Sequence, residues 1–354
     1  MSELTREGLW AKLRERELVG GELPAPEADR SPWFVRVMLG VAGWIGALFL
    51  LGFVGIALER LIESPPASLT AGALACAAAA AIFRARDSDL VTQFAFAVSL
   101  AGQALMANGW FDLVGSSSAA ALVVGAQQAA LFFLLPNFNH RVWASWSGAY
   151  AVVFALGKLG LAALAPALAT AAFLAVWLRE FDHPRQGRLL RSGGYGLAIA
   201  AVQAAVMQGP LTHVLLWGGT AGGDRVAMWI GAAAAGAVLL WAVLALLRRE
   251  GVALASGPGK SALAGAAILA VASLKAAGIG PATAILLVGY ANGNRLLAGL
   301  GIAALIGYLS HYYYSLQATL LEKSVLLAAA GLALIAARLA LAKLRPETGN
   351  KRHA

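Results

Sequence analysis

Residues 226–247 read VAMWIGAAAAGAVLLWAVLALL, an unbroken apolar run that ends at Arg248 and Arg249. Similar runs follow one another from Phe34 to Leu344, and short loops that carry basic residues separate them. About 20 residues of helix are needed to cross a hydrocarbon core of about 30 Å. Because these runs are continuously apolar and rich in Ala, Leu and Gly, they predict membrane helices and not the alternating strands of a barrel.

The composition also indicates a chain that needs lipid as its solvent. Hydrophobic residues make up 60% of the 354 residues and charged residues only 13%, with a mean hydropathy of +0.72. That leaves too few polar side chains to cover a water-soluble globule of this size. The net charge of +9 is explained by basic loops. Because no basic patch is interleaved with exposed aromatic residues, we expect the lipid bilayer as a partner and no nucleic acid.

The apolar runs predict an all-α membrane protein, a polytopic bundle of about twelve transmembrane helices. The predicted spans are residues 34–58, 66–83, 90–108, 118–135, 142–157, 160–178, 193–217, 226–247, 262–274, 279–291, 295–314 and 324–342. Residues 262–274 and 279–291 are shorter than a comfortable span. They either span separately or form a re-entrant hairpin with Lys275 at its tip.

The distribution of basic residues predicts the orientation of this bundle. Cytoplasmic loops of membrane proteins carry an excess of Lys and Arg. With the N-terminus in the cytoplasm, 22 of the 27 Lys and Arg fall on the cytoplasmic side, and the five outside are Arg60, Lys158, Arg225, Lys275 and Lys323. We therefore expect a protein of the bacterial inner membrane with both termini cytoplasmic. Seven tryptophans near predicted helix ends are expected at the headgroup level, where indole rings are enriched: Trp33, Trp110, Trp143, Trp146, Trp177, Trp217 and Trp229.

The predicted domain organisation has three parts. Residues 1–33 form a cytoplasmic helix and linker, residues 34–344 the transmembrane helical domain, and residues 345–354 a cytoplasmic basic tail. The N-terminal part has no apolar core of its own, which excludes a cleavable signal peptide. Its helix, near Leu4 to Val19, has a small apolar face, so it either docks on the loops or membrane surface or stays solvated. The lone Cys76 lies in an alanine run and offers no disulfide.

None of the predicted span interiors contains Asp or Glu. The polar side chains there are mainly the amides of glutamine. Amides inside a membrane bundle either join helices by hydrogen bonds or line a path for a solute. The candidates for both roles are Gln93, Gln103, Gln127 and Gln203. The histidines have no metal-ligand spacing and no nucleophile is paired with a base. We therefore expect no catalytic, metal or cofactor-binding residue, and no enzyme.

The stretch from Tyr308 to Lys323 is rich in aromatic and polar residues at a predicted outer helix end. Tyrosines in this position act either as interfacial anchors or as a rim that docks another protein. The candidate partner-binding residues are Tyr312, Tyr313, Tyr314, Glu322 and Lys323.

The run GNRLLAGLG at residues 293–301, followed by YYYSLQATLLEKS at residues 312–324, resembles the C-terminal signature of a bacterial multi-pass membrane family known as a domain of unknown function. A related group has a short cytoplasmic helix before its spans, which the Leu4 to Val19 segment resembles. Members similar to this chain are often encoded beside a periplasmic, membrane-anchored protein named for a GDYXXLXY motif. The resemblance implies such a partner, and it supplies no catalytic residue.

Two functions follow from these patterns. The first is a non-enzymatic membrane component that binds a periplasmic or membrane-anchored partner through the tyrosine-rich rim. The alternative is a secondary transporter or channel for a small neutral or weakly charged solute, because the twelve spans in two sets of six resemble transporters of that size. A cavity near mid-membrane lined by the glutamines would favour the transporter. A solid bundle with a groove at the tyrosines would favour the partner.

Overall fold

The computed structural model describes residues 6–17, 19–23, 64–85, 89–115, 117–208, 225–274, 276 and 278–315, with isolated positions from 38 to 56 and from 321 to 335. Every regular element in these ranges is a helix, and no strand occurs among them. The predicted spans 34–58 and 324–342, and Lys275, lie outside the described residues. The all-α prediction is therefore confirmed for the described part of the chain.

Each predicted span within the described residues corresponds to a helix. The helices are α1 (Arg6–Glu15), α4 (Pro65–Ala85), α5 (Asp89–Val114), α6 (Ser118–Leu134), α7 (Phe138–Lys158), α8 (Ala165–Trp177), α9 (Gly187–Val206), α11 (Arg225–Arg249), α12 (Gly257–Ser273), α13 (Ile279–Ala291) and α14 (Arg295–Ser315). Short 3-10 turns, η1 (Ala162–Leu164) and η2 (Pro184–Gln186), precede α8 and α9. The boundaries differ by six residues at the start of α9, which begins before the predicted residue 193, and at the end of α5, which extends beyond the predicted residue 108.

The described part does not support a count of twelve transmembrane helices. Four of its helices are long and apolar enough to cross a membrane: Pro65–Ala85, Val91–Val114, Pro184–Val206 and Val226–Arg249. Four other apolar helices are shorter: Ser118–Leu134, Ala162–Trp177, Ile279–Ala291 and Arg295–His311. The reason is geometric, since 13 residues of α-helix rise only about 20 Å. The predicted count took every apolar run as a full span, and apolar character alone does not fix helix length.

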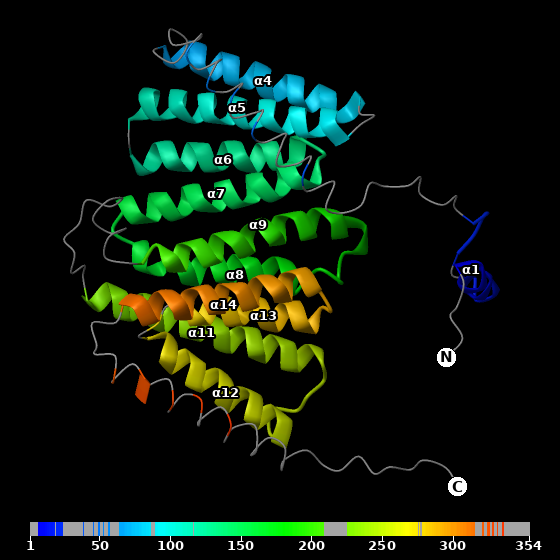
Figure 1. The fold of residues 1–354 in the computed structure, drawn as a ribbon, viewed down its shortest axis with the longest axis vertical. Helices are drawn as coiled ribbons and strands as arrows, with labels where there is room; N and C mark the ends of the chain where they lie inside the picture. The colour runs from blue at the N-terminus through cyan, green and yellow to red at the C-terminus, as the bar shows by residue number, and fades with distance from the viewer. Residues whose placement is uncertain are drawn as a thin grey trace.

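The helices of the bundle lie side by side with their axes roughly aligned, and consecutive helices run in opposite directions (Figure 1). One end of the bundle therefore holds the C-terminal ends of α4, α6, α8, α11 and α13, together with the N-terminal ends of the helices that follow them. That end carries most of the described basic residues: Arg84, Arg141, Arg179, Arg185, Arg188, Arg191, Arg248, Arg249, Lys260 and Arg295. At the opposite end are Lys158 and Arg225. We call the first the basic end.

Small residues allow the helices to approach closely. A Cβ added to Gly72 on α4 would lie 2.5 Å from the carbonyl oxygen of Gly102 on α5, and the converse distance from Gly102 is 2.6 Å. Gly289 and Gly301 play the same role between α13 and α14, where added Cβ atoms would lie 2.5 and 2.6 Å from backbone nitrogens of the facing helix. Close backbone contact of this kind drives helix association where lipid removes the hydrophobic effect.

The most deeply buried cluster lies where α8, α9, α11, α13 and α14 meet. Phe173, Leu174 and Trp177 of α8 pack there with Ile285 of α13 and Leu297 of α14. Trp177 is only 1% exposed. Its ring is packed inside the bundle, in the space that Gly194 leaves open on α9, and its place at the headgroup level stays a prediction.

The N-terminal helix α1 stands clear of the bundle (Figure 1). Leu9 on its small apolar face is 48% exposed. Docking of this helix on the loops or membrane surface stays a prediction from the sequence, as does the solvated alternative.

Candidate functional site

The clearest polar centre inside the bundle is built around Gln103 of α5. The Trp143 indole nitrogen of α7 donates to Oε1 of Gln103 at 3.0 Å. An indole N–H is a donor only, so this bond fixes the orientation of the amide. The amide nitrogen of Gln103 then lies 3.0 Å from Ser99 Oγ and 3.0 Å from His140 Nε2. Gln103 thus connects α5 to α7 through two contacts, with Trp143 and His140, and bonds Ser99 within α5.

This geometry defines the state of His140, which is fully buried. An amide nitrogen only donates, so His140 Nε2 must accept, and the imidazole is neutral with its proton on Nδ1. The rings of Phe83 and Phe96 face it edge-on at 6.2 and 6.3 Å between centroids. Nδ1 has no hydrogen-bond partner among the described residues. Buried polar atoms are normally paired, so the centre carries an uncompensated donor.

A cavity of about 350 Å³ adjoins this centre between α5, α6 and α7. It extends from Gln103 and Trp143 toward the helix ends opposite the basic end, where Phe111 and Phe154 line it. Most of its wall is apolar, and the polar side chains in the wall are Gln103, Gln128, Trp143, Ser147 and Tyr150. Apolar walls with a few placed polar groups are typical of small-molecule sites, and the volume lies within their range.

Gln128 is the least satisfied polar residue of the cavity wall. Its side chain is 4% exposed, and Oε1 has no partner among the described residues. Burying an amide oxygen without a hydrogen bond costs roughly 1 to 3 kcal/mol in proteins. Gln128 is not among the four candidate glutamines named from the sequence, because neighbouring Gln127 is identical in type and the sequence does not show which one faces the cavity.

The predicted glutamines are divided between the two roles that the sequence left open. Gln127 accepts from the Trp110 indole at 2.9 Å, and Gln203 accepts from the Trp146 indole at 2.6 Å. These pairs join neighbouring helices, as expected of packing amides. Gln93 is half-buried on α5 and does not line the cavity. Of the four candidates, only Gln103 both bonds to a neighbouring helix and lines the cavity.

The same contacts revise the predicted position of three tryptophans. Trp110, Trp143 and Trp146 each donate to a glutamine on another helix. Their indole nitrogens therefore stabilise the bundle and do not point to lipid headgroups. Proximity to a helix end suggested a headgroup position, but the glutamine partners come from distant parts of the sequence.

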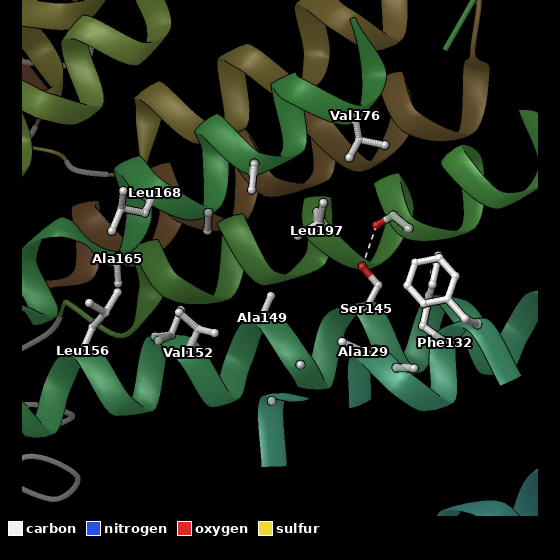
Figure 2. Close-up of a pocket in the computed structure, with 18 residues that line it drawn as sticks. Ala129, Phe132, Ser145, Ala149, Val152, Leu156, Ala165, Leu168, Val176 and Leu197 are labelled. Atoms are coloured by element: carbon white, nitrogen blue, oxygen red, sulfur yellow. Dashed lines mark hydrogen bonds between the residues drawn. The ribbon is translucent and has the colours of Figure 1, made fainter. Parts of the chain in front are cut away.

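A second hollow, of about 460 Å³, lies between α6, α7, α8 and α9 (Figure 2). Ser145 is the sole polar side chain in its wall, and its hydroxyl donates to the Gly193 carbonyl oxygen at 2.8 Å. Phe133, Val152 and Leu168 in the wall are 66%, 43% and 51% exposed. The hollow is thus an apolar groove on the surface of the bundle, which we call the α6–α9 groove.

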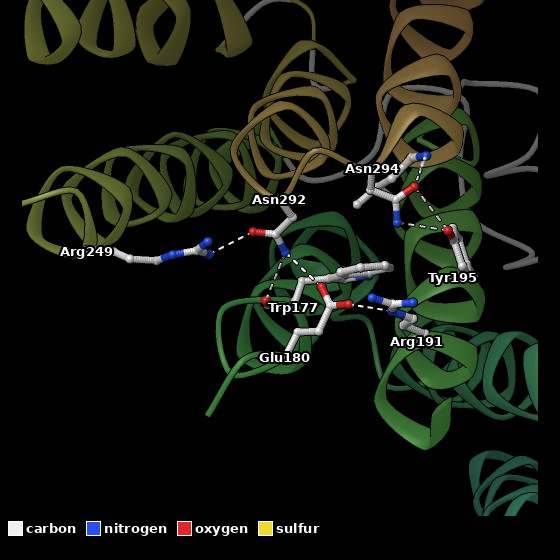
Figure 3. Close-up of polar contacts among 8 residues, drawn as sticks. Trp177, Glu180, Arg191, Tyr195, Arg249, Asn292 and Asn294 are labelled. Atoms are coloured by element: carbon white, nitrogen blue, oxygen red, sulfur yellow. Dashed lines mark hydrogen bonds and ion pairs between the residues drawn. The ribbon is translucent and has the colours of Figure 1, made fainter. Parts of the chain in front are cut away.

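A buried carboxylate lies at the basic end (Figure 3). Glu180, just after α8, accepts from Arg191 Nε of α9 at 2.6 Å and from Asn292 Nδ2 at 3.0 Å. Asn292 in turn accepts from Arg249 Nη1 at the end of α11, at 2.7 Å. The side chain of Glu180 is 5% exposed and that of Arg191 57%. Four helix ends are therefore joined through Glu180 and Asn292.

The three residues between α13 and α14 explain part of the GNRLLAGLG run. Asn292 ends α13, Gly293 has a φ of +63°, and the Asn294 side chain accepts from the Leu297 backbone N–H at 3.1 Å. Glycine at positive φ and asparagine at a helix N-cap are the usual residues for such a turn. Asn294 also bonds the Tyr195 hydroxyl, at 2.8 Å from its amide nitrogen. Gly293 and Asn294 thus stabilise the turn between α13 and α14 at the basic end.

The predicted tyrosine rim is described only in part. Tyr313 and Tyr314 at the end of α14 pack edge to face with centroids 5.5 Å apart, and Tyr314 is 80% exposed. The side chain of Tyr312 lies outside the described set, as do Glu322 and Lys323. The two described side chains lie at the helix end opposite the basic end, and partner binding there stays a prediction.

Metal-binding clusters were searched for in the described residues. No group of three or more His, Cys, Asp or Glu side chains is placed there to hold an ion. The buried members of these types in the described ranges are Cys76, His140 and Glu180, and Glu180 lies in a different polar cluster from His140.

Together these features define an all-helical protein with apolar helices able to cross a membrane and polar clusters buried between them. The chain belongs to the family described as Domain of unknown function (DUF4401), whose model matches residues 32–344. No curated protein and no solved structure matches the chain.

Proposed function

We propose that this chain is a non-enzymatic, multi-pass protein of the bacterial inner membrane with both termini in the cytoplasm. Four helices have the length and composition to cross a membrane. The shorter α6, α8, α13 and α14 lie alongside them in the same bundle (Figure 1), so we propose that they cross as well, with local thinning of the bilayer. The gathering of arginines at one end supports a cytoplasmic position for that end.

We further propose that the cavity between α5, α6 and α7 binds a small neutral solute, as in a secondary transporter or channel. The observation that supports this is Gln128, a buried amide in the cavity wall whose Oε1 lacks a partner. A solute that donates a hydrogen bond would relieve its desolvation cost. The wall contains no charged side chain, which favours an uncharged solute, because an unpaired charge in a bilayer is expensive.

The test is solute binding by the purified protein in nanodiscs. A panel of neutral hydrogen-bonding solutes (glycerol, urea, small amides and monosaccharides) is screened by thermal unfolding of wild type and Gln128→Leu. We expect at least one solute to raise the unfolding temperature of wild type and to lose this effect in Gln128→Leu. Stabilisation of both proteins alike would place binding elsewhere and contradict the proposal.

A second candidate function is the binding of a GDYXXLXY-type membrane-anchored partner at the outer face. The specific observation in its favour is Tyr314, 80% exposed beside Tyr313 at the end of α14. Tyrosine gives a large amphipathic contact area at low entropic cost. The two functions are compatible, because the cavity and the tyrosines lie on different helices.

A further inference from the structure

The α6–α9 groove has the shape and composition of a site for a hydrocarbon chain. Residues without bulky side chains leave its volume open, among them Gly125, Ala129, Gly148, Ala149 and Ala172. Ser145, the sole polar side chain in the wall, is already satisfied by Gly193. Figure 2 shows Ala149, Val152 and Leu168 lining the hollow from two facing helices.

Two arginines lie at the end of this groove. Arg141 donates from Nε to the carbonyl oxygen of Phe132, a wall residue, at 3.0 Å. Arg188 lies in the first turn of α9, the helix that contributes Gly193 and Leu197 to the wall. Burial lowers the pKa of Arg141, and the positive charge of Arg188 lowers it further.

No carboxylate in the described part of the chain neutralises this pair. Glu180, the buried carboxylate at the same end, is bound to Arg191 instead. Two positive charges next to an apolar groove match the two parts of an anionic lipid, a phosphate and an acyl chain.

We propose that the α6–α9 groove, with Arg141 and Arg188 at its end, is a binding site for one anionic phospholipid of the cytoplasmic leaflet. The acyl chain lies in the groove and the phosphate lies between the two guanidinium groups. Lipid tails are as apolar as the groove wall, so burial of the chain alone gives little selectivity. The headgroup charge therefore selects the lipid, and the groove fixes its position. This inference rests on the proposed orientation of the bundle and is independent of the solute cavity.

The experiment measures lipid retained by the full-length protein. Wild type and variants are purified from vesicles of equal phosphatidylglycerol and phosphatidylcholine, and bound lipid is quantified by native mass spectrometry. Arg188→Gln is the main variant, because Arg188 makes no hydrogen bond that holds the bundle together, whereas Arg141 also caps α6. Lys260→Gln removes one charge at the same end on α12, away from the groove, and is the matched control. Arg188→Lys tests rescue by charge.

We expect wild type to retain phosphatidylglycerol in preference to phosphatidylcholine. Loss of one basic residue near a lipid headgroup corresponds to roughly a fivefold weaker preference. Arg188→Gln should show this loss, while Lys260→Gln and Arg188→Lys should stay close to wild type. Equal retention of phosphatidylglycerol by Arg188→Gln and wild type would overturn the proposal.

A second pair of variants tests the groove itself. Ala149→Trp fills it, and Ala267→Trp places the same side chain on the exposed face of α12 as a control. Retained phosphatidylglycerol should fall in Ala149→Trp and not in Ala267→Trp. If Ala149→Trp retains lipid normally, or if inorganic phosphate competes as well as the lipid, the arginines bind a free anion and the lipid site is excluded. Reporter-based topology, measured separately, distinguishes failure of this site from a wrong orientation.

Discussion

Trp143 and Gln103 are joined by a hydrogen bond of 3.0 Å that orients the amide of a residue on α5 from an indole on α7. The bond directs the amide nitrogen of Gln103 toward His140 and Ser99. One side chain thus connects two helices at the inner end of the proposed solute cavity. The orientation of the Gln103 amide decides which polar atoms of this centre can form a hydrogen bond with a solute.

Replacing Gln103 by Leu should destabilise the protein. The substitution leaves the Trp143 N–H and His140 Nε2 buried without partners, and each such loss costs roughly 1 to 3 kcal/mol. The measurement is reversible unfolding in mixed micelles. Gln93→Leu, on the same helix and outside the network, is the control and should change stability by less than about 0.5 kcal/mol. A stable Gln103→Leu protein would mean that this network does not hold α5 to α7.

The two partners of the Glu180–Arg191 pair should respond unequally to substitution. Arg191→Gln leaves a carboxylate that is 5% exposed without its counter-ion, whereas Glu180→Gln leaves a guanidinium that is 57% exposed. An unpaired charge costs more folding free energy when it is buried than when it is exposed to solvent. We expect Arg191→Gln to unfold with at least about 1 kcal/mol less stability than Glu180→Gln. Equal losses would show that solvent already screens the carboxylate.

The basic end should face the cytoplasm. Fluorescent and phosphatase reporters fused after Ala354 test the predicted orientation of the C-terminus directly. We expect fluorescence without phosphatase activity, because the excess of Lys and Arg stays inside during insertion. The same reporters placed after Gly251, between α11 and α12, should give the same result. Phosphatase activity at Gly251 would reverse the orientation of the whole described bundle.

Alanine at Tyr312, Tyr313 and Tyr314 together should abolish co-purification with the proposed GDYXXLXY-type partner. Aromatic hot spots cost about 2 kcal/mol or more when truncated, which weakens binding by roughly thirtyfold. Tyr290→Ala provides a control, since Tyr290 is 84% exposed near the opposite end of the bundle. Undiminished co-purification at normal expression would assign the three tyrosines to interfacial anchoring.

The sequence was sufficient to predict the helices, because hydrophobic runs and their flanking charges are local signals. The ends of α13, predicted at residues 279 and 291, agree with the structure. The number of complete spans was not predictable in this way, since α8 and α13 are apolar but only 13 residues long. Whether a helix of a given length crosses the bilayer depends on its tilt and on its packing against other helices, which are tertiary properties.

The candidate site was predictable only in outline. Glutamines were identified as the polar residues of the spans, and Gln103 is at the cavity. Its partners His140 and Trp143 on α7 lie 37 and 40 residues away, so no local pattern links them to Gln103. Glu180 follows the predicted span 160–178 directly, and nothing in the sequence around it indicates that it is buried. Its burial arises from Asn292, 112 residues further along the chain.

The most direct test of the central claim is whether water and a small solute reach the cavity. Ala104 and Ala107 of α5 line it, so Ala104→Cys is introduced in a Cys76→Ala background and treated with N-ethylmaleimide in membranes. Ala267→Cys, exposed on α12, is the lipid-facing control, and Ala97→Cys, at a position 6% exposed, is the buried control. A thiol reacts as its thiolate, which forms only in contact with water. The account predicts rapid labelling at Ala104→Cys alone, slowed by any solute that stabilises wild type, whereas labelling no faster than at Ala97→Cys would contradict it.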